Sequence, residues 1–146
     1  SAAGCVSDPQ VVTITIAPEP VVSTTLDKSV CSDLPIALTL NTNGTSIGAA
    51  DYNIINQTIA AGLTPGGANA VVPANGVAAA YLASNVFTNN TNGPLTVTYT
   101  VVPRSAGNCF GNSRLITVTI NPEPVLSPAL DRTACSDVNI GLVLNT

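Results

Sequence analysis

The sequence predicts an all-β fold, an antiparallel β-sandwich repeated in tandem with a period of 104 residues. The first observation behind this prediction is that apolar and polar residues alternate along several short segments, as in strands with one buried face. The second is an internal repeat: Ser1–Thr42 and Ser105–Thr146 are identical at 21 of 42 positions without a gap. A fixed period of domain size indicates a chain of similar domains.

Two copies of a Pro-Glu-Pro motif divide the chain, Pro18-Glu19-Pro20 and Pro122-Glu123-Pro124. Proline has no amide hydrogen to donate and a fixed φ, so each motif ends one strand and keeps the next from continuing in register. The motif is also short and stiff, which restricts the angle between successive domains. We therefore expect the C-terminal strand or strands of a preceding repeat at 1–17, one complete repeat at 18–121 and the N-terminal strands of the following repeat at 122–146.

Four segments are the strongest candidates for strands. Three of them place apolar residues on one face and small or polar residues on the other: Pro35–Thr42, Leu95–Val102 and Leu115–Ile120. The fourth is Tyr52–Ile59, in which we expect Tyr52 and Ile54 to point inward. These faces would form the core between two packed sheets.

The segment Gly76–Asn85 is less regular than these strands. Its run from Val77 to Ala83 favours a helix in composition but is barely two turns long. We expect either a short helix or a strand that crosses between the sheets.

Composition excludes several classes of function. Only 8% of the residues are charged, against about 25% in a typical domain, and Thr, Asn and Ser take the polar positions. Such a neutral surface fits an extracellular protein better than a cytosolic enzyme. With a net charge of −4, one Lys and three Arg, the chain lacks the basic clusters that nucleic acid requires. No apolar stretch approaches the ~20 residues of a membrane-spanning helix.

The four cysteines admit two pairings. Within one repeat, Cys31 and Cys109 would form a structural disulfide, as is common in surface proteins. The rival pairing joins Cys5 to Cys31 and Cys109 to Cys135 across each Pro-Glu-Pro motif. The chain has no His and no C-x-x-C motif, so we expect no zinc site.

Catalysis and metal binding find little support. Without His, acid–base chemistry would fall to Asp and Glu, which do not converge in sequence, or to Lys28, which is Arg132 in the second copy. We expect no enzyme and no cofactor. Asp27 and Asp33 recur in the second copy and are weak calcium candidates, although carboxylates so spaced more often cap turns.

A set of motifs spread over the whole repeat resembles the PKD-like, immunoglobulin-type repeats of giant surface adhesins from gliding bacteria that use type IX secretion. The motifs are Val30-Cys31-Ser32-Asp33 before the alternating Ile36–Leu40, then Tyr52, Thr88–Asn92, Val97–Pro103, Asn108-Cys109-Phe110-Gly111 and Ile116–Pro122. The resemblance implies an immunoglobulin-like sandwich that serves as a spacer. The chain departs from it at Ile54, where Trp is common, and in the Ala-rich Val77–Ala83.

The function expected from these features is a structural stalk or spacer repeat of a very long extracellular filament or cell-surface adhesin. Its partners would be neighbouring repeats of the same polypeptide, and other fibres or cell-surface polysaccharide in addition. One alternative is a module that binds carbohydrate or a cell surface through its rows of Thr. Another is a filament subunit that self-assembles by strand addition, although the two ends of the chain duplicate the same strands and do not complement each other.

Overall fold

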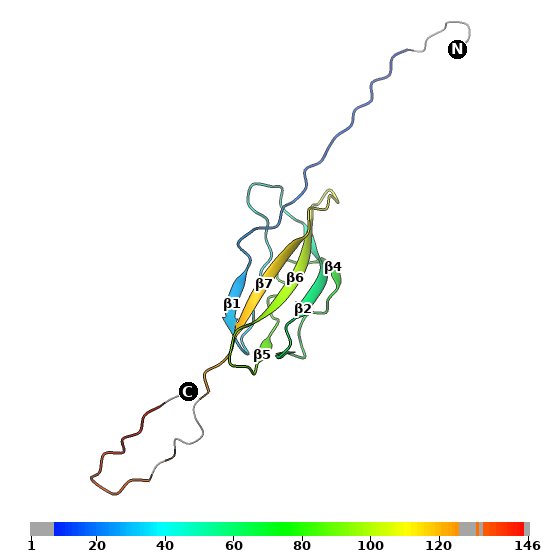
Figure 1. The fold of residues 1–146 in the computed structure, drawn as a ribbon. Coiled ribbons are helices and arrows are strands. Elements are labelled where there is room, and N and C mark those ends of the chain that lie inside the picture. The colour runs from blue at the N-terminus through cyan, green and yellow to red at the C-terminus, as the bar shows by residue number, and fades with distance from the viewer. Residues whose placement is uncertain (1–7, 126–130, 132, 145–146) are drawn as a thin grey trace.

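The computed structural model describes residues 8–125, 131 and 133–144. In this part of the chain the protein is all-β, with seven strands and no helix. The strands are β1 (Lys28–Cys31), β2 (Asp51–Ile59), β3 (Leu63–Pro65), β4 (Ala74–Val77), β5 (Phe87–Asn89), β6 (Leu95–Arg104) and β7 (Arg114–Asn121). Five of them form one sheet in the order β1-β7-β6-β2-β4, whereas β3 and β5 form a small second sheet (Figure 1).

The three long strands β2, β6 and β7 confirm the predicted alternation. β6 pairs in antiparallel fashion with both of its neighbours. Every second side chain of β6 and β7 enters the core, and so do Tyr52 and Ile54 at the start of β2, as expected. The buried residues of these strands are Tyr52, Ile54, Val97, Tyr99, Val101, Ile116, Val118 and Ile120. Burial of one face explains why Val, Ile and Tyr alternate with Thr here.

The edge strand β1 departs from the antiparallel expectation. It pairs with β7 in parallel, with Lys28 opposite Val118 and Cys31 opposite Asn121. Parallel neighbours need a long connection, and here the rest of the domain supplies it. The first and last strands of the domain are therefore neighbours that run in the same direction.

The expected strand Pro35–Thr42 keeps its buried face but is not a regular strand. Ile36, Leu38 and Leu40 are all buried. Ala37, however, has a φ of 48°, in the left-handed region, which breaks the extended backbone. The segment therefore joins its neighbours through scattered hydrogen bonds, such as those from the amide of Ile36 to the carbonyl of Asn85 and from Leu40 to Ala79.

Gly76–Asn85 forms neither of the two expected structures, a short helix or a single strand that crosses between the sheets. The segment begins in β4 and continues as successive turns, in which the amides of Tyr81, Ala83 and Asn85 each bond the carbonyl three residues earlier. A run this short gains too few hydrogen bonds to form a helix. It nevertheless crosses from the large sheet to β5 of the small one, and its Leu82 is fully buried in the core.

The chain enters the domain at one end and leaves it at the opposite end (Figure 1). Residues 8–19 lead in outside any strand, and β7 ends at Asn121 on the far side. Apolar side chains of the entry segment lie in solvent: Val11, Val12, Ile14 and Ile16 are between 80% and 90% exposed.

Candidate functional site

The two ends of the domain hold most of the residues singled out in the sequence. At the entry end, Pro20 is buried and packs against Gly111 in the loop between β6 and β7. A side chain at Gly111 would overlap the carbonyl group of Pro20 and approach Pro103. The amide of Gly111 also bonds the carbonyl oxygen of Pro103 at 2.9 Å. The last residue of the Pro-Glu-Pro motif is thus seated on the domain that follows it.

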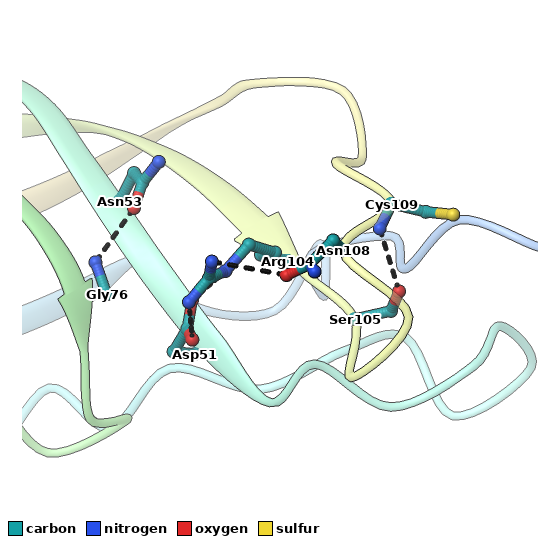
Figure 2. Close-up of polar contacts among 7 residues, drawn as sticks. All are labelled: Asp51, Asn53, Gly76, Arg104, Ser105, Asn108 and Cys109. Atoms are coloured by element: carbon teal, nitrogen blue, oxygen red, sulfur yellow. Dashed lines mark hydrogen bonds and ion pairs between the residues drawn. The ribbon is translucent and has the colours of Figure 1, made fainter.

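The loop beside this seat is held by hydrogen bonds and an ion pair (Figure 2). The amide of Ser105 bonds the carbonyl oxygen of Cys109 at 2.9 Å, and the Ser105 hydroxyl accepts a bond from the Cys109 amide at 3.2 Å. Arg104 makes two contacts with the Asp51 carboxylate, at 2.9 and 2.5 Å, and donates to the side chain of Asn108. Hydrogen bonding to Arg104 lowers the pKa of Asp51.

At the exit end, the second Pro-Glu-Pro motif lies along a pocket of about 570 Å³. Its lining comes from the turn after β1, the loop after β5 and the linker, namely Ser32, Asp33, residues 88–92 and residues 122–125. The turn after β1 is fixed by its side chains, since the Asp33 carboxylate accepts bonds from Thr88 at 2.5 Å and from Ser32 at 3.0 Å. Asp33 has a φ of 63°, a conformation that Asp tolerates better than most residues.

Asn89 ties the exit end together from inside. Its side chain, which is 5% exposed, donates to the carbonyl oxygens of Gly93 and Ile120, each within 2.9 Å, and accepts from Thr91. Its amide bonds the hydroxyl of Ser32 at 2.8 Å. The end of β7, from which the linker leaves, is therefore anchored to both neighbouring loops.

The comparison with known families agrees with this architecture. The model of the PKD-like domain matches residues 28–124, which include β1 to β7 and the second Pro-Glu-Pro motif. The chain belongs to the PKD-like domain family. Such domains are usually extracellular and typically non-catalytic. No curated protein and no solved structure gives a significant match.

The PKD-like domain keeps Cys31 and Cys109 apart. Cys31 lies opposite Asn121 at the end of β7, whereas Cys109 precedes the start of that strand, which is 8 residues or about 25 Å long. A disulfide needs Cα atoms about 5.5–6 Å apart. The expected bond within the repeat is therefore absent here. Among the residues that the structure describes, Cys31, Cys109 and Cys135 are free thiols, so the rival bond between Cys109 and Cys135 is not formed either. Cys5, of the rival pairing, lies outside the described residues.

The calcium candidates Asp27 and Asp33 flank β1 and are not brought together. Asp27 accepts a hydrogen bond from the amide of Thr117 at 2.9 Å and so ties the start of β1 to β7. Asp33 caps the turn after β1 as described above. Among the described residues no cluster of three or more potential metal ligands occurs.

The rows of Thr meet on the outer face of the large sheet. Thr98 pairs with Thr117 and Thr96 with Thr119 across β6 and β7. Tyr99 of β6 is buried on the other side. The face is therefore neutral and hydroxyl-rich.

In the described part of the chain, no helix is long and apolar enough to cross a membrane.

Sequence reasoning missed the two residues that build the ends of the PKD-like domain, Gly111 and Asn89. Both lie inside motifs that carried the family resemblance, but neither motif states a role. Their roles depend on Pro20 and Ile120, which are distant in sequence. A Gly shortly after a hairpin turn is the one local sequence signal of close backbone packing. In the structure the φ of Gly111 is not positive, so the close contact with Pro20 is what requires a glycine there.

Proposed function

We propose that the PKD-like domain is a structural spacer, one of a tandem series in a very long filament or adhesin on a bacterial cell surface. The observation that carries the proposal is that sequence copies of two of its core segments lie bare in solvent. Ile16 is 90% exposed, whereas its counterpart Ile120 is fully buried in β7. Likewise Ile140 is 59% exposed and its counterpart Ile36 is fully buried. Apolar segments of this kind are stable when the rest of a domain covers them.

The repetition of the turn after β1 is an argument for a second domain beyond the linker. Its backbone is repeated in residues 133–144 without a folded core around it. Asp33 and Asp137 have φ values of 63° and 65°. The amide of Leu34 bonds the carbonyl of Cys31 at 3.4 Å, and in the second copy Val138 bonds Cys135 at 3.3 Å. Local sequence thus encodes the same turn twice, as expected of two similar domains.

The placement of the linkers favours an extended, stiff array. Each domain would seat the final Pro of the preceding motif against its β6–β7 loop, as Pro20 lies against Gly111. Because entry and exit are at opposite ends, domains joined in this way would extend one another. Their partners are then neighbouring repeats of the same polypeptide. The resemblance of the motifs alone ties this array to gliding bacteria and type IX secretion.

The outer face of Thr residues favours a second candidate function, binding of polysaccharide or another cell surface. The pairs Thr96–Thr119 and Thr98–Thr117 present a regular set of hydroxyls. Against it, the aromatic rings that sugars stack on are scarce, at 3% of the chain. Assembly by strand addition would use the edge strands β1 and β4 and is not required if the polypeptide is continuous.

Electron microscopy of the intact protein, released from its source under non-reducing conditions, tests the proposal. Thin fibres with an axial repeat of a few tens of Å, the length of one sandwich, are the expected result. Compact particles without periodicity would overturn the spacer function and leave binding by the Thr face as the function to test.

A further inference from the structure

We propose that successive domains are joined by a disulfide between Cys31 of one domain and the counterpart of Cys109 in the next. The proposal rests on the tandem array proposed above. It differs from a bond within the repeat, which the distance between the two ends of β7 excludes. It makes the cysteines a cross-link between domains.

Cys31 lies at the exit end, beside the linker. It is exposed at the end of β1, opposite Asn121, the residue that precedes the Pro-Glu-Pro motif. Its neighbour Ser32 lines the same pocket as Pro122 and Pro124. The thiol is therefore available on the surface that a following domain would approach.

Cys109 lies at the entry end, beside the other linker. It precedes by two residues Gly111, the seat of Pro20. The two hydrogen bonds with Ser105 fix the backbone of its loop. Figure 2 shows its sulfur pointing away from the sheet and from Ser105. The thiol is partly exposed and lies 3.9 Å from the carbonyl oxygen of Gly107.

The repeat brings these two ends together. Pro20 and Pro124 are equivalent, so the loop with the Cys109 counterpart of the next domain would pack on Pro124 as Cys109's own loop packs on Pro20. From Asn121 to Pro124 is three residues, at most about 10 Å. Both thiols thus flank one short linker, and the stiffness of that linker keeps them there.

The same rule assigns all four cysteines. Cys109 pairs with the Cys31 counterpart of the domain before it. Cys5 and Cys135 are the counterparts of Cys109 and Cys31 and pair in the same way with cysteines of adjoining repeats. Every domain then contributes one thiol to each of its two junctions.

Formation of the bond requires an oxidant, here a small disulfide such as oxidised glutathione. One cysteine thiolate attacks that disulfide and releases a glutathione thiol, and the second cysteine then displaces the other glutathione. One S–S bond between domains forms, one S–S bond of glutathione breaks, and the two protons of the cysteines end on two glutathione thiols. An extracellular setting supports this chemistry.

The test uses the full chain continued by a second copy of residues 43–146, since Thr146 and Thr42 occupy the same position of the repeat. After oxidation with glutathione and digestion with trypsin, Cys31 lies in peptide 29–104 and Cys109 in peptide 105–114. We expect mass spectrometry without reductant to find these two peptides linked, with the loss of two free thiols. Reduction should separate them.

Two serine variants identify which copy supplies the partner. The link should persist when Cys109→Ser is made in the first copy and disappear when it is made in the second copy. The opposite pattern would show a bond within one domain and overturn the proposal, and no link in the unmodified chain would overturn it as well.

Small-angle scattering of the reduced two-domain chain separates this inference from the proposed function. An elongated, stiff pair of domains in the reduced chain, together with no linked peptides after oxidation, would overturn the disulfide alone. A second copy that stays unfolded, or a flexible pair, would overturn the tandem spacer and the disulfide with it.

Discussion

At the scale of single residues, the core of this domain hides a small polar network. Tyr99 and Asn85 are both fully buried. The side-chain NH₂ of Asn85 donates to the Tyr99 hydroxyl at 3.0 Å. The side-chain oxygen of Asn85 accepts from the backbone amide of Ala70 at 2.8 Å. Gln57 also donates to the Tyr99 hydroxyl. Burial raises the pKa of Tyr99, so the hydroxyl stays neutral and the network stays intact over the physiological range.

Removing the Tyr99 hydroxyl should therefore lower the free energy of unfolding by more than the loss of a single hydrogen-bonding group exposed to water would. Tyr99→Phe leaves the side chain of Asn85 buried without its acceptor, and we expect a loss of about 1–3 kcal/mol in the free energy of unfolding. Urea titration followed by circular dichroism measures it. Tyr81→Phe is the matched control, because Tyr81 donates to the exposed carbonyl of Val71, which water can satisfy. Equal losses in the two variants would contradict this account.

The ion pair of Asp51 and Arg104 makes stability depend on pH in one direction. The pair lowers the pKa of Asp51 below its ordinary value of 3.8. As the pH falls, Asp51 is therefore protonated in the unfolded chain before it is protonated in the folded one. Its stabilising contribution is present above about pH 4 and is lost as the pH falls through the folded pKa.

Asp51→Asn should accordingly melt at a lower temperature than the unaltered chain at pH 7, and the difference should shrink on acidification. Thermal melts between neutral and acidic pH measure this convergence. Asp8→Asn, in the exposed entry segment, is the control and should leave the melting curve unchanged at every pH. A difference for Asp51→Asn that persists in acid would mean that the ion pair is not its cause.

At the scale of elements, the decisive contact is between the linker and the β6–β7 loop. We expect Gly111→Ala to push Pro20 out of its seat, because the new side chain overlaps backbone that has no flexible end to move. Overpacking costs about 1–3 kcal/mol. The amide of Ser23, bonded to Asn41 at 3.0 Å, should lose protection from hydrogen exchange by about tenfold or more.

Hydrogen exchange followed by nuclear magnetic resonance gives this protection residue by residue. Gly67→Ala is the matched control, since a side chain there meets open space. Protection of the β6 amides should stay unchanged in both variants. An unchanged Ser23 in Gly111→Ala would show that the entry segment does not depend on this contact.

The elements that the sequence predicted are those whose pattern is local. Alternation along Leu95–Val102 and Leu115–Ile120 identified β6 and β7 because burial of one face decides a strand. Alternation along Pro35–Thr42 identified buried residues but not the irregular backbone, since the left-handed φ of Ala37 has no signal in an Ala. Gly141 occupies the same position in the second copy and is the one hint of that conformation.

Relations between distant segments could not be predicted in this way. The short strands β3 and β5 form because they pair with each other, and β1 forms because it pairs with β7. The predicted pairing of Cys31 with Cys109 rested on these two being the cysteines of one repeat. It fails because β1 runs parallel to β7, which places the two thiols at opposite ends, and strand direction is a property of the whole sheet.

At the scale of the whole molecule, the exposed entry segment makes a prediction about association. Val11–Ile16 presents alternating apolar side chains without a partner, a pattern that invites pairing between chains. The double variant Ile14→Lys, Ile16→Lys should reduce self-association of the 146-residue chain by several-fold in sedimentation velocity.

The control adds the same charge on the opposite face, as Thr13→Lys and Thr15→Lys. It should reduce association less, since these residues alternate with the apolar ones. Equal effects would mean that added charge, and not loss of the apolar face, is responsible.

The parallel pairing of β1 with β7 has a mechanical consequence. The chain enters above β1 and leaves below β7 (Figure 1), so tension applied to its two ends pulls these neighbouring strands in opposite directions along their length. Their hydrogen bonds are then sheared together instead of being unzipped one after another. Such a geometry resists load best along the axis on which a tethered chain would carry it, and it lets the domain bear tension without opening its core.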